Sequence, residues 1–297
     1  MSPSSSIVSI IIVTYNNGRD IKNCLNSILR QNEIPCEVIL VDNNSQDTTV
    51  RIVQKEFANV KLIVNSTNLG YAQANNQGIS QSHGKYILLL NPDTQLTTNT
   101  VAKMVQFLEL DSQYAALAPK LLNPDGSIQA SLRAFPNYKI LLWEITGLSR
   151  IFPRHKRFSR WRMGYFDYNK IAEIDQPMAS CLLIKKEVFE KIGQFDEKFP
   201  VFFNDVDFSK RMKLAGFKTV YLPDAEVYHS RGASTGQVRA KMIWQWHISL
   251  FRYFKKYNSG LGFNFISIPL CLIILLGAFF RILIFRIKTL FAVKTKN

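Results

Sequence analysis

The sequence lacks the glycine-rich patterns that cradle phosphates in two common nucleotide-binding folds. The first apolar run is followed by TYNNGRD (14–20), with no G-x-G-x-x-G, and the chain contains no G-x-x-x-x-G-K-[ST]. Those glycines let a pyrophosphate or a triphosphate lie against the start of a helix. Their absence argues against a dinucleotide cofactor and against a P-loop.

Cysteine is also scarce, and the first residues lack the basic n-region of a secretory signal. The four cysteines contain no C-x-x-C pair and form no dense disulfide framework. The first ten residues, MSPSSSIVSI, have no basic segment ahead of an apolar one. These features indicate a reducing, cytoplasmic setting.

Acidic residues are missing from the C-terminal 67 positions, 231–297, which hold eleven Lys and Arg residues of a chain with net charge +15. Within this tail, residues 261–280 form an uncharged run long enough to span a bilayer, interrupted by Pro269. The following RILIFRIKTLF suits a helix lying in an anionic membrane interface. We expect a membrane-attached tail. Spanning, re-entrant and interfacial placements stay open, as does a buried pair of core helices.

A second basic cluster lies in RIFPRHKRFSRWR (150–162). A run of charge is often just a solvated face of the protein. Nucleic acid is the next candidate partner, and a contact with the membrane surface is the third.

The N-terminal 118 residues alternate strand and helix signals. Strands are predicted at 7–13, 37–41, 60–64 and 85–90, and helices at 21–29, 47–57 and 99–108, the last with Asn99 as its N-cap. This alternation predicts a parallel, right-handed, doubly wound α/β sheet with helices on both faces. Such sheets bind ligands beyond the carboxyl ends of their strands.

Polar side chains follow three of these strands. Thr14 and Asn16 come after the first strand, Asp42 ends the second, and Asp93 follows the fourth across Asn91-Pro92. Asp42 has the chemistry to accept from a base N–H or a ribose hydroxyl, and Asp93 to bind a divalent cation that neutralises a diphosphate. Any one of them alone is compatible with an ordinary turn.

The second half adds another acidic cluster. A strand is predicted at 179–184, a short helix ending at Gly193, and a helix from near Asp205 to Gly216. Asp205 and Asp207 lie in the first turn of that helix, where the helix dipole favours acids, so stabilisation of the helix start explains them as well as proton transfer does.

Six segments in order resemble the inverting family-2 glycosyltransferases with the GT-A fold, especially rhamnosyltransferase-type enzymes of bacterial cell-surface polysaccharide synthesis. They are VSIIIVTYNNGRDIKNCLNSILRQ (8–31), VILVDNNSQDTT (38–49), NLGYAQANNQGI (68–79), YILLLNPDT (86–94), QPMASCLLIKKEVFEKIGQFDEKFPVFFNDVDFSKRMKLAGF (176–217) and PDAEVYHSRGAS (223–234).

The resemblance implies roles for particular residues. Nucleotide and sugar binding falls to Thr14, Asn16, Asp42, Asn68, Gly70 and Asn75, Mg²⁺ or Mn²⁺ binding to Asp93 and His229, and general-base catalysis to Asp205. Arg211 has two equally open roles, a phosphate contact or an i,i+4 pair with Asp207. Two positions depart from the common pattern: the metal motif has one acid, and Asn204 leaves Asp205 without a carboxylate neighbour to raise its pKa.

The resemblance further implies a direct displacement that transfers a sugar, rhamnose from dTDP-rhamnose or another nucleoside diphosphate sugar, to a polyprenyl-diphosphate-linked saccharide. The reaction would take place at the cytoplasmic face of the cell membrane, with no nucleic acid partner. The expected organisation is a GT-A domain at 1–236, with a nucleotide-sugar half (about 1–118) and an acceptor half (about 119–236), and a basic, apolar helical tail at 237–297.

Three other functions remain open from the sequence. A basic nucleic-acid-binding module would not need Asp93 or Asp205. A nucleotidyltransferase that makes sugar nucleotides would want a Gly- and Lys/Arg-rich first loop, which TYNNGRD does not match. A membrane scaffold with a degenerate transferase domain would tolerate loss of its acids.

Overall fold

The computed structural model describes residues 7–230, 239–258, 269, 276, 277 and 279. Contacts divide the chain into two compact units. Unit 1 comprises Met1–Pro200 and Asn204–Ala233, and unit 2 comprises Val201–Phe203 and Ser234–Asn297. The boundary expected near residue 236, between a GT-A domain and a helical tail, stays a prediction.

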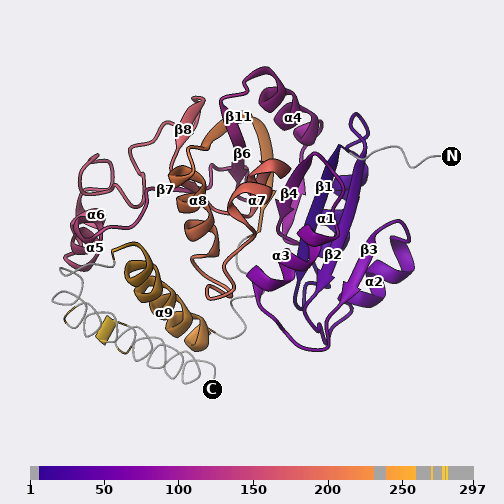
Figure 1. The fold of residues 1–297 in the computed structure, drawn as a ribbon, viewed down its shortest axis with the longest axis horizontal. Helices are drawn as coiled ribbons and strands as arrows, with labels where there is room; N and C mark the ends of the chain where they lie inside the picture. The colour runs from indigo at the N-terminus through magenta and orange to yellow at the C-terminus, as the bar shows by residue number, and fades with distance from the viewer. Residues whose placement is uncertain (1–6, 231–238, 259–268, 270–275, 278, 280–297) are drawn as a thin grey trace. The chain divides into compact units, whose positions relative to one another are not determined.

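Unit 1 is built on one large twisted sheet (Figure 1). The strands of the unit are β1 (Val8–Thr14), β2 (Cys36–Asp42), β3 (Lys61–Val64), β4 (Tyr86–Leu90), β5 (Thr94–Leu96), β6 (Tyr114–Leu122), β7 (Leu132–Arg133), β8 (Ala172–Ile174), β9 (Gln176–Pro177), β10 (Cys181–Lys185) and β11 (Lys218–His229). The large sheet has the order β3-β2-β1-β4-β10-β6-β11-β5, with β8 paired to β11, while β7 and β9 form a separate pair.

The first four strands in that order, β3 to β4, are all parallel, as predicted for the N-terminal half. β10 then enters antiparallel between β4 and β6, and β5 pairs antiparallel with β11. The sheet is therefore mixed and mostly parallel. The antiparallel insertion places the start of β10, Cys181, opposite Leu90 at the end of β4.

Helices cover both faces of the sheet. The helices of unit 1 are α1 (Ile21–Leu29), α2 (Thr49–Glu56), α3 (Tyr71–Ser80), α4 (Thr100–Leu110), α5 (Tyr138–Ile145), α6 (Leu148–Ile151), α7 (Lys186–Ile192) and α8 (Asn204–Leu214). Unit 2 contains α9 (Arg239–Tyr257). The apolar stripes of α1 and α4 pack on one sheet face, and those of α3, α7 and α8 on the other.

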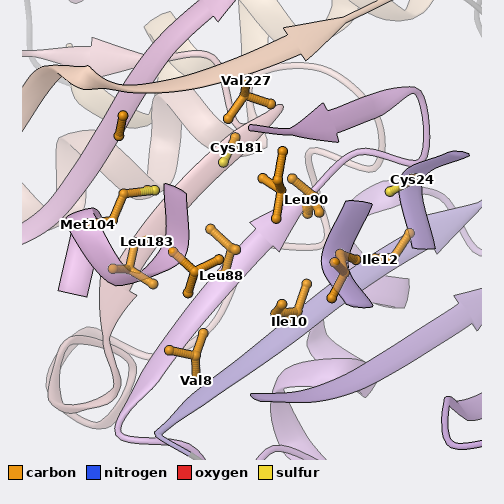
Figure 2. Close-up of a cluster of buried hydrophobic side chains, with 14 of the residues drawn as sticks. Val8, Ile10, Ile12, Cys24, Leu88, Leu90, Met104, Cys181, Leu183 and Val227 are labelled. Carbon is orange, nitrogen blue, oxygen red and sulfur yellow. The ribbon is translucent and has the colours of Figure 1, made fainter. Parts of the chain in front are cut away.

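Alternation along the strands supplies both cores. Val8, Ile10 and Ile12 of β1 point to the α1 and α4 side, together with Leu88 and Leu90 of β4 (Figure 2). Ile11 of β1 and Ile87 and Leu89 of β4, which alternate with them, belong to the opposite core. Strands buried on both faces read as continuous apolar runs, which is why the sequence identified them.

One helix start differs from expectation. Asn99 was predicted to cap α4 with its side chain, but it adopts a left-handed conformation (φ 61°) and makes no side-chain capping bond. Gly193 does end α7, with φ 75° as predicted for a C-terminal glycine.

Unit 2 is described mainly through α9. The ring of Phe203 packs against Trp246 and Tyr253 of this helix, with centroid separations of 5.7 and 5.8 Å. No helix among the described residues is both long and apolar enough to cross a bilayer. The uncharged run predicted at 261–280 and the basic segment after it lie almost wholly outside the described residues.

Candidate active site

The loops after β1 and β2 are tied together at the carboxyl edge of the sheet. Asp42 accepts hydrogen bonds from the Thr14 hydroxyl (2.8 Å) and from the backbone N–H (2.8 Å) and hydroxyl (2.6 Å) of Ser45. Asn16, at φ 54°, donates its backbone N–H to Ser45 (2.8 Å) and accepts from the N–H of Gln46 (2.8 Å). Thr14 and Asp42 are fully buried, so they shape this loop from beneath rather than from its surface.

The start of α3 is built on a close approach of two backbones. The carbonyl of Pro200 accepts from the N–H groups of Tyr71 (2.6 Å) and Ala72 (3.1 Å), which satisfies donors that a helix start leaves unpaired. Gly70 has φ 84°, and a Cβ there would lie 2.8 Å from the Pro200 oxygen. The carbonyl of Gly70 accepts from the Asn43 amide (3.0 Å). Position 70 therefore needs glycine.

Two asparagines near this helix start have different environments. Asn68 is exposed, and its side-chain oxygen accepts from the Gly70 N–H (2.9 Å). Asn75 is buried and donates to the Tyr71 carbonyl of its own helix (2.8 Å). Asn68 is thus placed at the surface of the loop, whereas Asn75 stabilises α3 internally.

Strand pairing brings Asp93 and His229 together. β5 and β11 pair with His229 opposite Thr94, next in sequence to Asp93. The Nε2 atom of His229 lies 3.3 Å from Oδ1 of Asp93, and the backbone N–H of Ser230 donates to the Asp93 carbonyl (2.9 Å). Both side chains are largely buried, with 4% and 8% of their surface exposed.

The hydrogen bonds of Gln129 determine which nitrogen of His229 carries the proton. The Gln129 amide nitrogen donates to the carbonyl of His229 (3.1 Å) and to Oδ1 of Asn123 (2.8 Å). Its oxygen therefore faces Nδ1 of His229 at 2.6 Å, and an acceptor there requires a proton on Nδ1. In the neutral imidazole, Nε2 then presents its lone pair toward Asp93.

This pair has the chemistry of a metal half-site. One carboxylate oxygen and one imidazole lone pair converge, which is a donor set that accepts Mn²⁺ or Mg²⁺. Among the described residues, no group of three or more His, Cys, Asp or Glu side chains is arranged to hold a metal. Mg²⁺ is commonly held by one or two carboxylates together with substrate phosphates and water. Asp93 and His229 therefore fit a cation whose other ligands come from the donor diphosphate.

Asp205 has a separate and different environment in the first turn of α8. Its carboxylate accepts from the N–H of Val206 (2.8 Å) and from the Gln176 amide (3.3 Å). Burial raises the pKa of Asp205 above its ordinary value, and this effect outweighs the backbone hydrogen bonds from Val206 and Ala179 and the attraction of Arg133. Loss of solvent therefore raises the pKa of Asp205, and no neighbouring carboxylate contributes, because residue 204 is asparagine.

Tyr71 links the two acidic regions. Its hydroxyl donates to the carbonyl of Ala179 (3.0 Å), whose N–H hydrogen bonds to Asp205. Burial raises the pKa of Tyr71, and the negative charges of Asp205 and Asp93 raise it further. The phenol therefore lies within electrostatic reach of both carboxylates.

Arg211 forms the i,i+4 pair with Asp207, which is one of the two roles that the sequence left open for it. Its Nε donates to the buried Asp207 (2.9 Å), and its other nitrogens donate to the carbonyls of Ile192 (2.7 Å), Gly193 (3.4 Å) and Gln194 (2.7 Å). The guanidinium thus ties α8 to the end of α7, and we leave Arg211 out of the proposed site. Among the described residues, no basic side chain forms an ion pair with Asp205.

Long-range contacts supply residues that sequence reasoning missed. Gln129 lies 100 positions from His229, and Tyr71 lies 108 positions from Ala179. Ser45 was within reach of sequence reasoning, because a serine three residues after an aspartate commonly closes a turn on that acid.

Comparison with known proteins decides the family. Residues 9–193 match the model for Glycosyl transferase family 2. The chain belongs to this family. It is an inverting glycosyltransferase that uses a nucleotide-sugar donor.

Two curated relatives cover most of this glycosyltransferase. An N-acetylglucosaminyl-diphospho-decaprenol L-rhamnosyltransferase of Mycobacterium tuberculosis is 29% identical over 276 residues, 86% of each chain. The low-salt glycan biosynthesis hexosyltransferase Agl10 of Haloferax volcanii is 23% identical over 85% of this chain and 76% of its own.

Solved structures support the GT-A fold. TarS 1-349 of S. aureus matches with a TM-score of 0.53 and 19% identity, over 86% of this chain and 76% of that one. GalNAc-T7, solved with UDP, GalNAc and Mn²⁺, matches with a TM-score of 0.54 and 15% identity, over 77% of this chain and 44% of that one. At these identities the likeness establishes the fold alone.

Proposed function

We propose that this enzyme transfers rhamnose from dTDP-rhamnose to a hydroxyl of a polyprenyl-diphosphate-linked saccharide at the cytoplasmic face of the cell membrane. The donor and acceptor are suggested by the mycobacterial relative, whose name gives a rhamnosyl product on a diphospho-decaprenol carrier. The basic, apolar tail predicted from sequence provides a means of reaching a lipid-linked acceptor.

The environment of Asp205 is the observation that carries this proposal. Its carboxylate is half-buried, has a raised pKa and has no ion-pair partner among the described residues, whereas Asp207 is neutralised by Arg211. A raised pKa brings an acid closer to the range in which it accepts protons efficiently near neutral pH. Asp205 is therefore the better general base of the two.

In the proposed reaction, Asp205 removes the proton from the acceptor hydroxyl as that oxygen attacks the anomeric carbon. The bond from this carbon to the donor diphosphate breaks, and the nucleoside diphosphate leaves with the electron pair. Attack opposite the leaving group inverts the anomeric configuration without a covalent enzyme intermediate.

The loops on the other side of the site bind the donor. Asn16 and Asn68 face the loop surface, while Thr14, Asp42, Gly70 and Asn75 maintain its shape from within. Asp93 and His229 would hold Mg²⁺ or Mn²⁺, which when bound supplies positive charge to stabilise the departing diphosphate.

A donor panel tests the proposal. The purified full chain is assayed with dTDP-rhamnose and with UDP-, GDP- and dTDP-linked hexoses, using a diphosphate-linked N-acetylglucosaminyl lipid and Mg²⁺ or Mn²⁺. We expect transfer from dTDP-rhamnose and its loss in EDTA. Transfer from a different donor in preference to dTDP-rhamnose would overturn the proposed sugar, and full activity in EDTA would overturn the metal site.

A further inference from the structure

The region of α5 and α6 exposes an unusual concentration of large apolar side chains. Leu142, Ile145, Ile151 and Phe152 lie within eleven residues and expose 49%, 53%, 66% and 46% of their surface. Single exposed apolar residues are normal on soluble proteins, but a group of four on one short helical hairpin marks an interaction surface. Figure 1 shows α5 and α6 together at the end of unit 1 opposite β3.

A central phenylalanine holds this region in one arrangement. The Phe158 ring lies 5.1 Å from Trp143 of α5, 5.5 Å from Phe152 and 4.7 Å from His155. Leu142 and Ile145 are three positions apart on α5 and therefore lie on the same side of it. The exposed apolar residues thus belong to a packed element rather than to separate loops.

The same element is strongly basic. Its exposed cations are Lys139, Arg150, Arg154, Lys156, Arg157 and Arg160. The acid between positions 138 and 166 is Glu144, and Arg162 binds both of its oxygens, at 3.0 and 2.7 Å. The guanidinium of Arg157 lies over the Trp143 ring at 5.6 Å, which places a cation against the aromatic cluster that includes Phe152. Between positions 138 and 166 there is therefore no unpaired carboxylate that would repel an anionic partner.

We propose that residues 138–162 form a docking surface for an anionic lipid bilayer. Leu142, Ile145, Ile151 and Phe152 enter the boundary between head groups and acyl chains, and the surrounding arginines and lysines contact lipid phosphates. A nucleic acid would satisfy the charges, but its phosphate backbone offers nothing to the aliphatic side chains of Leu142 and Ile151. The combination of exposed aliphatic and basic side chains favours the bilayer.

This surface goes beyond the C-terminal tail considered from sequence, because it belongs to the same compact unit as Asp93 and Asp205. It gives the catalytic unit its own fixed orientation toward the membrane. The inference rests on the proposed function only in placing the acceptor in a bilayer. Its test therefore measures membrane contact without any turnover.

A site-specific probe on the full chain tests the surface. Ile151→Cys is labelled with an environment-sensitive fluorophore, and Leu110→Cys, at a position with 89% exposure on α4, is the matched control. The natural chain labelled in the same way gives the background of its four cysteines. Vesicles of phosphatidylcholine with phosphatidylglycerol should shift the Ile151 probe to the blue, and a lipid-borne quencher should quench it, while the Leu110 probe stays unchanged.

Charge variants provide a second measurement. Arg154→Gln, Arg157→Gln and Arg160→Gln together should weaken vesicle binding and abolish the Ile151 response, at about 5-fold in affinity for each cation that contacts the membrane. The control replaces the exposed residues Arg30, Arg51 and Lys55 of the opposite end of unit 1 with glutamine and should leave the response intact.

Two outcomes would overturn the proposal. An Ile151 probe that behaves like the Leu110 probe would show that residues 138–162 do not enter the bilayer. A probe that responds to duplex DNA or RNA but not to anionic vesicles would make the surface a nucleic-acid site. Neither outcome bears on whether the enzyme transfers rhamnose, which the donor panel decides separately.

Discussion

Asp205 and Asp207 lie two positions apart on α8 in opposite electrostatic environments. Asp205 has a raised pKa and hydrogen bonds from amides, while Asp207 is fully buried against Arg211. Asp205→Asn should lower the transfer rate by about 10²–10⁴ with little change in donor affinity, because an amide cannot accept the proton. Single-turnover transfer and donor Kd measure the two effects.

Asp207→Asn is the matched comparison. It leaves the Arg211 charge without its carboxylate partner and should cost about 3 kcal/mol of unfolding free energy, with transfer per folded molecule largely retained. Near-normal transfer by folded Asp205→Asn would reject Asp205 as the base, and a larger rate loss in Asp207→Asn would transfer that role to Asp207.

The raised pKa of Asp205 also makes a prediction about stability. The folded protein holds this proton at pH values where the unfolded chain, with an ordinary pKa of about 3.9, has released it. The resulting stabilisation is complete below that ordinary pKa and is lost as the pH rises through the raised pKa of the folded state. Asp205→Asn should therefore have a higher Tm than the natural enzyme at neutral pH, and the difference should shrink toward pH 4. A difference that is independent of pH would contradict the burial effect.

Gln129 is expected to act on the metal through His229. Gln129→Met keeps the length of the side chain but removes the acceptor for the Nδ1 proton, so the imidazole loses its fixed tautomer and orientation. Loss of such an outer partner typically weakens metal affinity 10–100-fold. Mn²⁺ binding in the presence of dTDP, followed by electron paramagnetic resonance, measures this directly. Gln113→Met, at an exposed position, is the control, and unchanged Mn²⁺ affinity in folded Gln129→Met would remove Gln129 from the site.

At the scale of elements, periodicity predicted what is local. The predicted strands at 7–13, 37–41 and 85–90 agree with β1, β2 and β4 to within one residue at each end. The helix expected from Asp205 to Gly216 is α8, which begins one residue earlier and ends at Leu214. These elements are readable because burial on one or both faces leaves a clear apolar pattern.

The order and direction of the strands after β4 could not be predicted from the sequence. β10 lies antiparallel between two strands that are more than 20 residues apart in the chain, and an apolar run carries no sign of its direction. The residues of the candidate site were likewise predictable where they end strands, and not where distant strands bring them together. Thr14 and Asp42 end strands and were predicted to meet, whereas Gln129 reaches His229 only through the pairing of distant strands.

The turn into α3 allows an element-scale test with a matched glycine. Gly70 and Gly126 both have φ just above 80°, but a Cβ at 70 would collide with the Pro200 carbonyl, and one at 126 meets nothing within 4 Å. Gly126→Ala should cost about 1 kcal/mol of unfolding free energy from backbone strain alone. Gly70→Ala should cost more and should also weaken donor binding, because the loop must move away from Pro200. Equal losses in chemical denaturation would show that the contact with Pro200 is unimportant.

At the scale of the whole molecule, two features are proposed to act at a membrane: the basic docking surface in unit 1 and the tail expected from the sequence. They respond differently to salt. The cations of residues 138–162 act over a Debye length that falls to about 3 Å at 1 M salt, so their contribution is screened there. The uncharged run at 261–280 is expected to act through burial of apolar surface, which salt does not weaken.

A chain ending at Tyr257 separates the two contributions. At low salt, both the full chain and the shortened chain should sediment with phosphatidylglycerol vesicles, because both retain residues 138–162. At about 1 M salt, where charge is screened, only the full chain should remain bound. Sedimentation at the two salt concentrations measures the contribution of charge and that of the apolar run in one experiment. Release of the full chain by salt as complete as that of the shortened chain would show that the tail holds the membrane through charge, and that its apolar run is buried within the protein.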